Sequence, residues 1–364
     1  MEALRGFVVG GLMKGWWRMK MKSCWLAVVM ALTVAFNGLW GAEKPDAGEK
    51  APKYAAADYN LVKKYGWPDA IVGIDQNQNR LEILRADKPW NDPASLLWCW
   101  NSSTAKELSE NEKKTFGNIS DAKPVLGGTH LLTCASGGAV ALINIKECRA
   151  EFIGYAGGNT HSIELLPDGN IVAASSNGNF LSLLVRDGGK RAPKKVLKVP
   201  LEDAHGCVWD KQRNILWACG MKEIAAYEYD AEKWELRKLF ACAPDYEIFS
   251  ANSQLPPVKG KFGGHDLFPV AGEDKLFLTN WYNVLTFDPR TREFALYHEQ
   301  PRIKSISRNP ESGEVIMQVP VTKWWTESIT TQAPQAGRLR TLPGAKFYKA
   351  RWFTANLFSY GLIK

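Results

Sequence analysis

A histidine followed by a pair of short apolar segments recurs along this chain at nearly constant intervals. His161 precedes IVAASSNGNFLSLL, His205 precedes ILWACGMKEIAAYEY and His265 precedes LFLTNWYNVLTFD. The same frame extends outward to Asp121 and Lys304, and the five positions are 40, 44, 60 and 39 residues apart. Intervals of roughly 40–50 residues are typical of one four-stranded propeller blade. The repeat therefore predicts blades around a central channel on which these residues converge.

Turn-forming residues separate the apolar segments within each copy. In residues 161–185, PDGN lies between HSIELL and IVAAS, and NGN lies between IVAAS and FLSLLV. Asn and Gly readily adopt the positive φ angles of tight hairpins, so each copy is expected to be an antiparallel meander. No segment of ten or more residues after residue 60 has a 3.6-residue apolar period. The pattern favours an all-β fold over a βαβ fold.

The predicted number of blades depends on how the first copy, which lacks an innermost strand, is completed. AIVGIDQ, NRLEILRAD and SLLWCWNSS are expected to be its second, third and fourth strands, and nothing before Ala70 resembles an innermost strand. Residues 353–362 could supply that strand and close the ring, which would remove the exposed sheet edges. The prediction is a six-bladed β-propeller of four-stranded antiparallel blades closed by the C-terminal segment. Five blades with a separate edge hairpin is the alternative.

The interval of 60 residues contains an insertion. Its excess falls in residues 241–264, ACAPDYEIFSANSQLPPVKGKFGG, where Pro and Gly interrupt any strand. This loop enters the copy that starts at His265. We therefore expect it to fold over or beside the histidine end of the channel and to restrict access.

The N-terminus predicts export. Arg18, Lys20 and Lys22 precede an apolar run that ends at Trp40, followed by small residues and a polar stretch. This order indicates a signal peptide over residues 1–41, of which residues 1–20 could come from a wrongly assigned start, and a polar linker over residues 42–66. A retained membrane anchor is the alternative, although the run is short for a span of roughly 20 residues. Residues 67–364 are then one propeller domain of a secreted or periplasmic protein.

Charge and cysteine content describe an ordinary soluble surface. Residues 1–41 hold five Lys or Arg and one Glu, so the remaining chain has 41 basic and 37 acidic residues without a clustered basic face. Nucleic acid is not an expected partner, and we expect a monomer without a membrane span after processing. Among the six remaining cysteines, Cys207 and Cys219 flank a hairpin and are either a disulfide pair or apolar thiols.

The repeated positions supply the candidate site. A single histidine at a strand start is usually structural, but three in one register favour a shared ligand, since Ser, Thr or Asn would pack equally well there. Lys304 and Arg302 would attract an anion such as a carboxylate. The candidate binding residues are His161, His205, His265, Lys304, Asp121, Asp266 and Arg302. The three histidines are also the candidate ligands of a divalent metal.

Aromatic residues near turns are a further candidate feature. Trp281 and Tyr282 lie in LTNWYN, and Trp324 and Trp325 lie in TKWWTES. Exposed rings at such positions can stack on sugar faces, and buried rings would instead pack between blades. The sequence allows both interpretations.

Four blocks of this sequence resemble a known group of proteins. AGGNTHSIELLPDGNIVAAS, DAHGCVWD, GGHDLFPV and IKSISRNP resemble the repeated blocks of a family of secreted bacterial β-propellers with WD40/YVTN-like repeats and no assigned function, and the likeness covers residues 67–352. The chain is more distantly similar to oligogalacturonate lyase. In that propeller enzyme, histidines and a glutamine hold a divalent metal that binds the uronate carboxylate. The resemblance implies a metal on His161, His205 and His265, but it assigns neither the glutamine nor the base.

Three functions are consistent with these patterns. The first is a binding protein that holds a small anionic or carbohydrate ligand in a histidine-lined funnel, with or without a divalent metal. The second is a metal-assisted lyase acting on oligosaccharides that contain uronic acids. The third is a scaffold whose channel is filled by a structural polar plug. No GxSxG, HExxH or phosphate-binding glycine motif occurs, so serine hydrolase, zincin and nucleotide-binding functions are not indicated.

Overall fold

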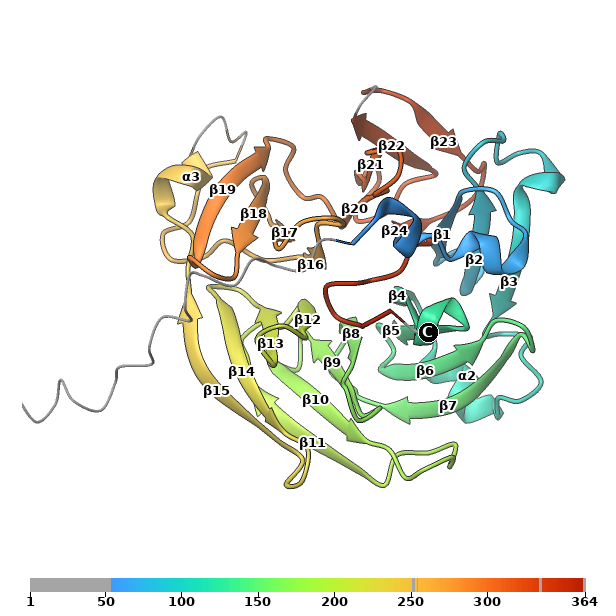
Figure 1. Ribbon diagram of the computed structural model, residues 1–364, viewed down its shortest axis with the longest axis horizontal. Coiled ribbons are helices and arrows are strands. Elements are labelled where there is room, and N and C mark those ends of the chain that lie inside the picture. The colour runs from blue at the N-terminus through green and yellow to red at the C-terminus, as the bar shows by residue number, and fades with distance from the viewer. Residues whose placement is uncertain (1–53, 251–252, 254, 334–335, 363–364) are drawn as a thin grey trace, which may run out of the picture. The chain divides into compact units, whose positions relative to one another are not determined.

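The computed structural model describes residues 54–250, 253, 255–333 and 336–362. In this part of the chain, β-strands form six four-stranded antiparallel sheets arranged in a ring (Figure 1). The six-bladed propeller is confirmed, and the five-bladed alternative is wrong. The predicted signal peptide at residues 1–41 lies outside the described residues.

Each blade runs from an innermost strand at the channel to an outermost strand at the rim. From the inside outward, blade 1 consists of β24 (Phe347–Trp352), β1 (Ala70–Asp75), β2 (Arg80–Arg85) and β3 (Leu96–Asn101). Blade 2 consists of β4 (Ile119–Val125), β5 (His130–Ala135), β6 (Ala139–Asn144) and β7 (Arg149–Tyr155). Blade 3 consists of β8 (Thr160–Leu165), β9 (Ile171–Ser175), β10 (Phe180–Val185) and β11 (Lys195–Pro200).

The second half of the ring repeats this arrangement. Blade 4 consists of β12 (Gly206–Asp210), β13 (Ile215–Cys219), β14 (Ile224–Asp230) and β15 (Glu235–Cys242). Blade 5 consists of β16 (Asp266–Pro269), β17 (Leu276–Thr279), β18 (Val284–Asp288) and β19 (Glu293–His298). Blade 6 consists of β20 (Ser305–Arg308), β21 (Val315–Gln318), β22 (Ser328–Ala333) and β23 (Leu339–Thr341).

In the described residues, helical structure is limited to short segments before β1 and between later strands. The α-helices in the described residues are α2 (Glu110–Thr115) and α3 (Tyr246–Ser250), and the 3-10 turns are η1 (Ala56–Tyr59), η2 (Val62–Tyr65), η3 (Pro93–Ser95) and η4 (Leu126–Gly128). Residues 54–66 belong to the predicted linker. Tyr59, Leu61 and Val62 are buried there, so the compact unit begins before residue 67. Across the described segments, no helix has the length and hydrophobicity needed to cross a bilayer.

The apolar core lies between neighbouring blades. One buried cluster joins blades 2 and 3 through residues such as Leu132, Phe152 and Ile163, and similar clusters occupy the other interfaces. A blade packed on both faces has no solvent side, so strands such as β1 and β8 are buried along their whole length. Burying one such Leu, Ile or Phe side chain stabilises the fold by roughly 1.5–3 kcal/mol.

The ring is closed by the C-terminal segment, but through a different strand from the one we expected. β24 pairs antiparallel with β1, with Gly73 opposite Ala350 and Ile71 opposite Trp352. The closing strand is therefore Phe347–Trp352, and the prediction for residues 353–362 is wrong. Lys349 and Arg351 concealed the strand in the sequence, because charged residues suggested exposure and yet their side chains are fully buried. Residues 353–362 instead cross the end of the channel where β24 finishes (Figure 1).

Cys207 and Cys219 do not form a disulfide, so the disulfide interpretation of this pair is wrong. Both thiols are free and buried. Cys207 pairs with Ala218 across the β12–β13 hairpin and Cys219 pairs with Gly206. Side chains alternate along a strand, so the two thiols point to opposite faces of blade 4.

The insertion at residues 241–264 enters the histidine end of β16 but packs toward the rim. α3 lies at the outer edge of the ring beside β19 (Figure 1). The Ile248 carbonyl accepts a hydrogen bond from the Asn283 side chain, and the Val258 N–H donates to the Tyr282 hydroxyl. Both partners belong to the β17–β18 turn. The described part of the loop thus braces this turn and does not cover the channel.

Candidate functional site

The structure brings three imidazoles together at the end of the channel where the innermost strands begin. His161 is the second residue of β8, and His205 and His265 immediately precede β12 and β16. The rings of His161 and His205 are stacked, with centroids 4.7 Å apart and planes 4° from parallel. The centroids of His205 and His265 are 5.6 Å apart. The three histidines form one continuous cluster.

A β-bulge explains why His161 lies inside its strand. Thr160 pairs with Ser175 and Ser162 pairs with Ala174, which leaves His161 as the extra residue. A bulge redirects the side chain of the extra residue. In β8 it keeps the imidazole at the level of His205 and His265. Strand β4 has the same irregularity at Ser120, so Ser120 is the structural counterpart of His161.

Two further polar side chains complete this level of the channel. The amine of Lys304, which precedes β20, lies 3.1 Å from Nε2 and 3.4 Å from Nδ1 of His265. The hydroxyl of Tyr348, from β24, lies 2.9 Å from Nδ1 of His161. We call these five side chains the histidine layer: Tyr348, His161, His205, His265 and Lys304.

Burial sets the protonation of the histidine layer. Desolvation, together with the neighbouring His205 and the charges of Lys304 and Lys349, lowers the pKa of His161 and of His265 well below 6.5. Desolvation also lowers the pKa of Lys304 to about 8, with Lys349 adding to the shift and Asp203 opposing it. At neutral pH, His161 and His265 are uncharged, and His265 lies beside an amine that is costly to keep protonated.

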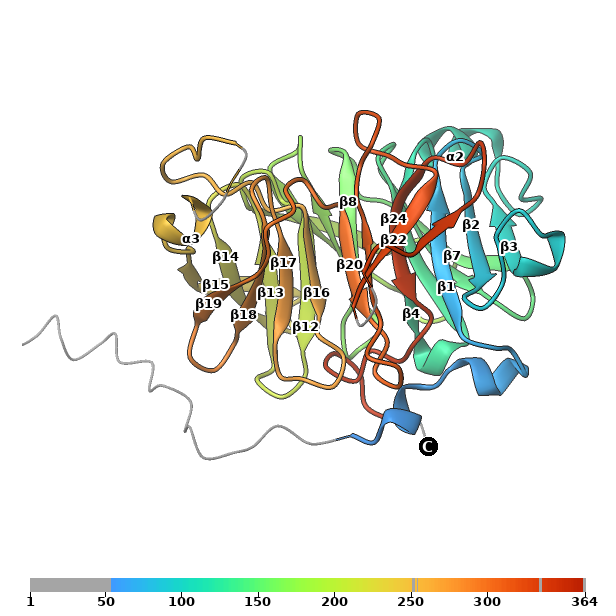
Figure 2. The same ribbon diagram turned by 90° about the horizontal axis from the view of Figure 1, so that it is seen from above.

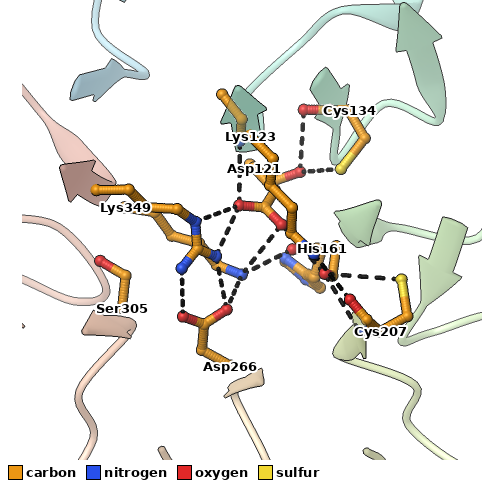
Figure 3. A network of polar contacts seen from close by, with 12 residues as sticks. Asp121, Lys123, Cys134, His161, Cys207, Asp266, Ser305 and Lys349 are labelled. Atoms are coloured by element: carbon orange, nitrogen blue, oxygen red, sulfur yellow. Dashed lines mark hydrogen bonds and ion pairs between the residues drawn. The ribbon is translucent and has the colours of Figure 1, made fainter. Parts of the chain in front are cut away.

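A second group of polar side chains lies deeper in the channel than the histidine layer. We call it the ion-pair layer: Asp121, Lys123, Glu164, Asp266, Lys349 and Arg351. Figure 3 shows its centre. The Arg351 guanidinium donates to Asp121 Oδ1 at 2.8 Å and to Asp266 at 2.8 and 2.9 Å. The Lys349 amine donates to Asp266 Oδ1 at 2.9 Å and to the His161 carbonyl at 2.9 Å.

The ion-pair layer continues toward the opposite end of the channel. The Lys123 amine donates to Glu164 Oε2 at 2.8 Å and to the Cys207 carbonyl at 2.7 Å. The Tyr360 hydroxyl, from the C-terminal tail, donates to the other Glu164 oxygen. All six charged side chains are almost fully buried, with three of each sign. These pairings fill the channel with a polar plug.

Asp121 and Asp266, two of the candidate binding residues, are both paired with cations of this plug. Burial alone would raise the pKa of each carboxyl, but Arg351 and Lys349 hold both below the ordinary Asp value. Asp121 also lies one residue beyond the position that the repeat assigned to it, since Ser120 occupies the place of His161. Both carboxylates are bonded to protein cations and have no exposure to solvent.

The described residues do not fit a metal centre. They contain no group of three or more His, Cys, Asp and Glu side chains placed to hold a metal ion. The reason is visible in the histidine layer. Parallel stacked rings such as those of His161 and His205 do not direct their nitrogens at one common point.

Trp324 is an exposed aromatic residue tied to this end of the channel. Its side chain is 42% exposed, and its indole N–H donates to Gln76 Oε1 at 3.0 Å. The Gln318 amide donates to the Trp324 carbonyl, and the Gln318 backbone carbonyl accepts from the Lys304 N–H at 3.1 Å. Trp324 is thus linked to the histidine layer. Tyr282 is buried and packs in the core instead.

Some of these residues are predictable from the sequence and others are not. Arg302 is exposed and its charge helps to lower the pKa of Lys304, so it lies at the rim of the same end. Lys123, Lys349, Arg351 and Tyr360 were not foreseen. A signal was present for three of them, because Lys and Arg alternate with apolar residues in DAKPV and FYKARW. Such alternation on an innermost strand places the charges in the channel.

The fold and its filled channel define the class of this protein as a six-bladed β-propeller. The chain belongs to a family described as a family of unknown function, DUF6528, whose model matches residues 63–363. No curated protein matches it. Among solved structures, a chain of hydrazine synthase from Kuenenia stuttgartiensis is similar at 12% identity and a TM-score of 0.40. The similarity covers 62% of this chain and 65% of that one.

Proposed function

We propose that this propeller is a binding protein that holds a small anionic or carbohydrate ligand at the histidine layer. The observation that carries the proposal is the position of Lys304. Its amine is largely removed from water beside the His265 ring, where its pKa falls to about 8. Burying a cation in this way costs stability. A ligand carboxylate would offset that cost, as Asp121 and Asp266 do for Arg351 deeper in the channel.

The neighbouring side chains suit a sugar acid. Neutral imidazoles can both donate and accept hydrogen bonds with hydroxyl groups, which a protonated imidazole cannot. Trp324 presents an exposed ring that is held by Gln76 and can stack on a sugar face. Uronic acids combine a carboxylate with sugar hydroxyls, so they are the ligands to test first.

The other two functions are weaker for specific reasons. A metal-assisted lyase needs convergent metal ligands, which the described residues do not provide. A structural plug describes the ion-pair layer well but leaves the Lys304 amine unexplained, since packing alone does not require a cation there. Export of the protein, predicted from residues 1–41, is part of the proposal, and N-terminal sequencing of the mature protein from its native host would test it.

The experiment is a binding comparison with galacturonate and glucuronate against galactose and glucose. Binding would be measured by calorimetry and by ligand-induced thermal stabilisation. We expect the acids to bind at least tenfold more tightly than the neutral sugars, and Lys304→Met to remove that preference. His205→Ala should weaken both kinds of ligand. Lys195→Ala, on the outer strand β11, is the matched control. Absence of stabilisation by all four compounds would leave the structural plug as the better account.

A further inference from the structure

A pocket of about 490 Å³ lies at the end of the channel opposite the histidine layer. The β12–β13 and β16–β17 turns, residues 354–358 of the C-terminal tail, and Tyr54 and Tyr59 from the start of the described chain form its walls. In Figure 2, the N-terminal helical turns and the C-terminus lie together along one edge of the ring. Pockets of roughly 300–1,000 Å³ are the usual size for small-molecule ligands.

Aromatic rings line this pocket, and one of them, Phe268, packs against the Arg351 guanidinium. Tyr54, Tyr59, Phe268 and Phe358 all contribute to the lining. The Arg351 guanidinium lies 4.0 Å from the centroid of the Phe268 ring. Arg351 is in turn bonded to Asp121 and Asp266. The Phe268 ring therefore has little freedom, which lowers the entropic cost of stacking a flat ligand against it.

Among the described residues, the carboxylates in the pocket walls have ion-pair partners, whereas the two lysine amines do not. The carboxylates are already paired: Asp210 and Asp274 accept from Arg213, and Glu273 accepts from Arg308. The Lys211 amine uses two of its three donors, on the Tyr54 hydroxyl at 2.7 Å and on the Tyr360 carbonyl at 2.8 Å. The Lys275 amine forms no ion pair with the described residues. Lys211 and Lys275 therefore line the pocket with N–H donors that no carboxylate of the described residues accepts.

We propose that this pocket binds a small organic anion that carries a flat apolar ring, such as an aromatic carboxylate or sulfonate. The anionic group would take the spare N–H donors of Lys275 and Lys211, and the ring would lie among the tyrosine and phenylalanine rings. This site is separate from the histidine layer, because the ion-pair layer fills the channel between them. It does not depend on the proposed function.

Two fluorescent probes that differ in one group test the inference. 8-Anilinonaphthalene-1-sulfonate carries the anion, and N-phenyl-1-naphthylamine is the same ring system without it. Titration of the mature protein should show one site whose affinity for the sulfonate is at least tenfold higher than for the amine. Lys275→Ala should weaken sulfonate binding about tenfold and leave amine binding within twofold. Ala271→Trp, which fills the pocket, should remove both.

The controls distinguish binding in this pocket from binding elsewhere on the protein. Lys195→Ala and His205→Ala should leave both probes unaffected, and the thermal unfolding of each variant shows whether it is folded. Equal affinity for the two probes would overturn the proposal of an anion site. Binding that survives in folded Ala271→Trp would overturn the pocket itself. Loss of sugar binding in His205→Ala concerns only the histidine layer, so the two proposals fail independently.

Discussion

The histidine layer and the ion-pair layer are built on the same ring of innermost strands but treat charge in opposite ways. In the ion-pair layer, each buried cation contacts a carboxylate within hydrogen-bonding distance, as Arg351 does with Asp121 and Asp266. In the histidine layer, the Lys304 amine lies against a neutral imidazole instead. The first arrangement stabilises a channel without help from outside. The second leaves interactions that a ligand can complete.

Removing one side chain from each layer should show the largest difference. Arg351→Met leaves Asp121 and Asp266 buried with only Lys349 and the more distant Lys123 to compensate them, and we expect it to lower the free energy of unfolding by about 3–5 kcal/mol. Lys304→Met removes a cation that is costly to bury and should change stability by less than about 1 kcal/mol. Urea unfolding at about pH 7.5 measures both. The comparison fails if Lys304→Met is as damaging as Arg351→Met.

Acidification should destabilise the protein through the histidine layer. In the unfolded chain the two imidazoles titrate near 6.5, while in the folded protein the pKa of His161 and of His265 is lower. The unfolded state therefore binds more protons below pH 6.5, and the stability present above that pH is lost as the pH falls. We expect a loss of about 1 kcal/mol per histidine between about pH 7.5 and about pH 5.5.

Unfolding of histidine variants at these two pH values tests this expectation. His161→Asn and His265→Asn should each reduce the loss of stability on acidification. His298→Asn, on the outer strand β19, is the control and should show the same loss as the unchanged protein. Equal pH dependence in all four proteins would mean that the histidine layer does not titrate in this way.

The tail that covers the other end of the ion-pair layer should be more easily released than the blades. Tyr360→Phe removes the hydroxyl that donates to Glu164, and we expect it to cost about 1 kcal/mol. Faster hydrogen exchange confined to residues 353–362 would identify local opening of the tail. Tyr155→Phe, an exposed tyrosine on β7, is the control. Uniformly faster exchange throughout the blades would instead show that the tail holds the ring together.

Metal removal should have the smallest effect. Because the His161 and His205 rings are stacked in parallel and do not direct their nitrogens at one point, we expect the melting temperature to change by less than about 1 °C with a chelator or with added Mn²⁺, Ca²⁺ or Zn²⁺. Thermal unfolding and metal analysis of the purified protein measure this directly. A shift of several degrees would restore the metal-binding hypothesis for His161, His205 and His265.

The architecture could be predicted from the sequence alone, because blade repetition is a local property. Each copy has its own hairpin turns and apolar segments. Asp-Gly in PDGN and Asn-Gly in NGN therefore predict hairpins without any information about the other blades. The register of His161, His205, His265 and Lys304 follows from the same repeat. The register was off by one residue at Asp121, because the structural counterpart of His161 in β4 is Ser120, and a serine does not mark the repeat position in the sequence.

Which polar residues fill the channel, and how they pair, depends on contacts between blades that the sequence does not show. Lys349 and Arg351 lie more than 200 residues from Asp121 in the sequence, and closure of the ring brings them together. A buried charge is stable when its partner is present, and that partner comes from another blade. For the same reason, the sequence could not show that Asp266 and its neighbour His265 belong to different layers. Asp266 is bonded to Arg351, and His265 lies beside Lys304.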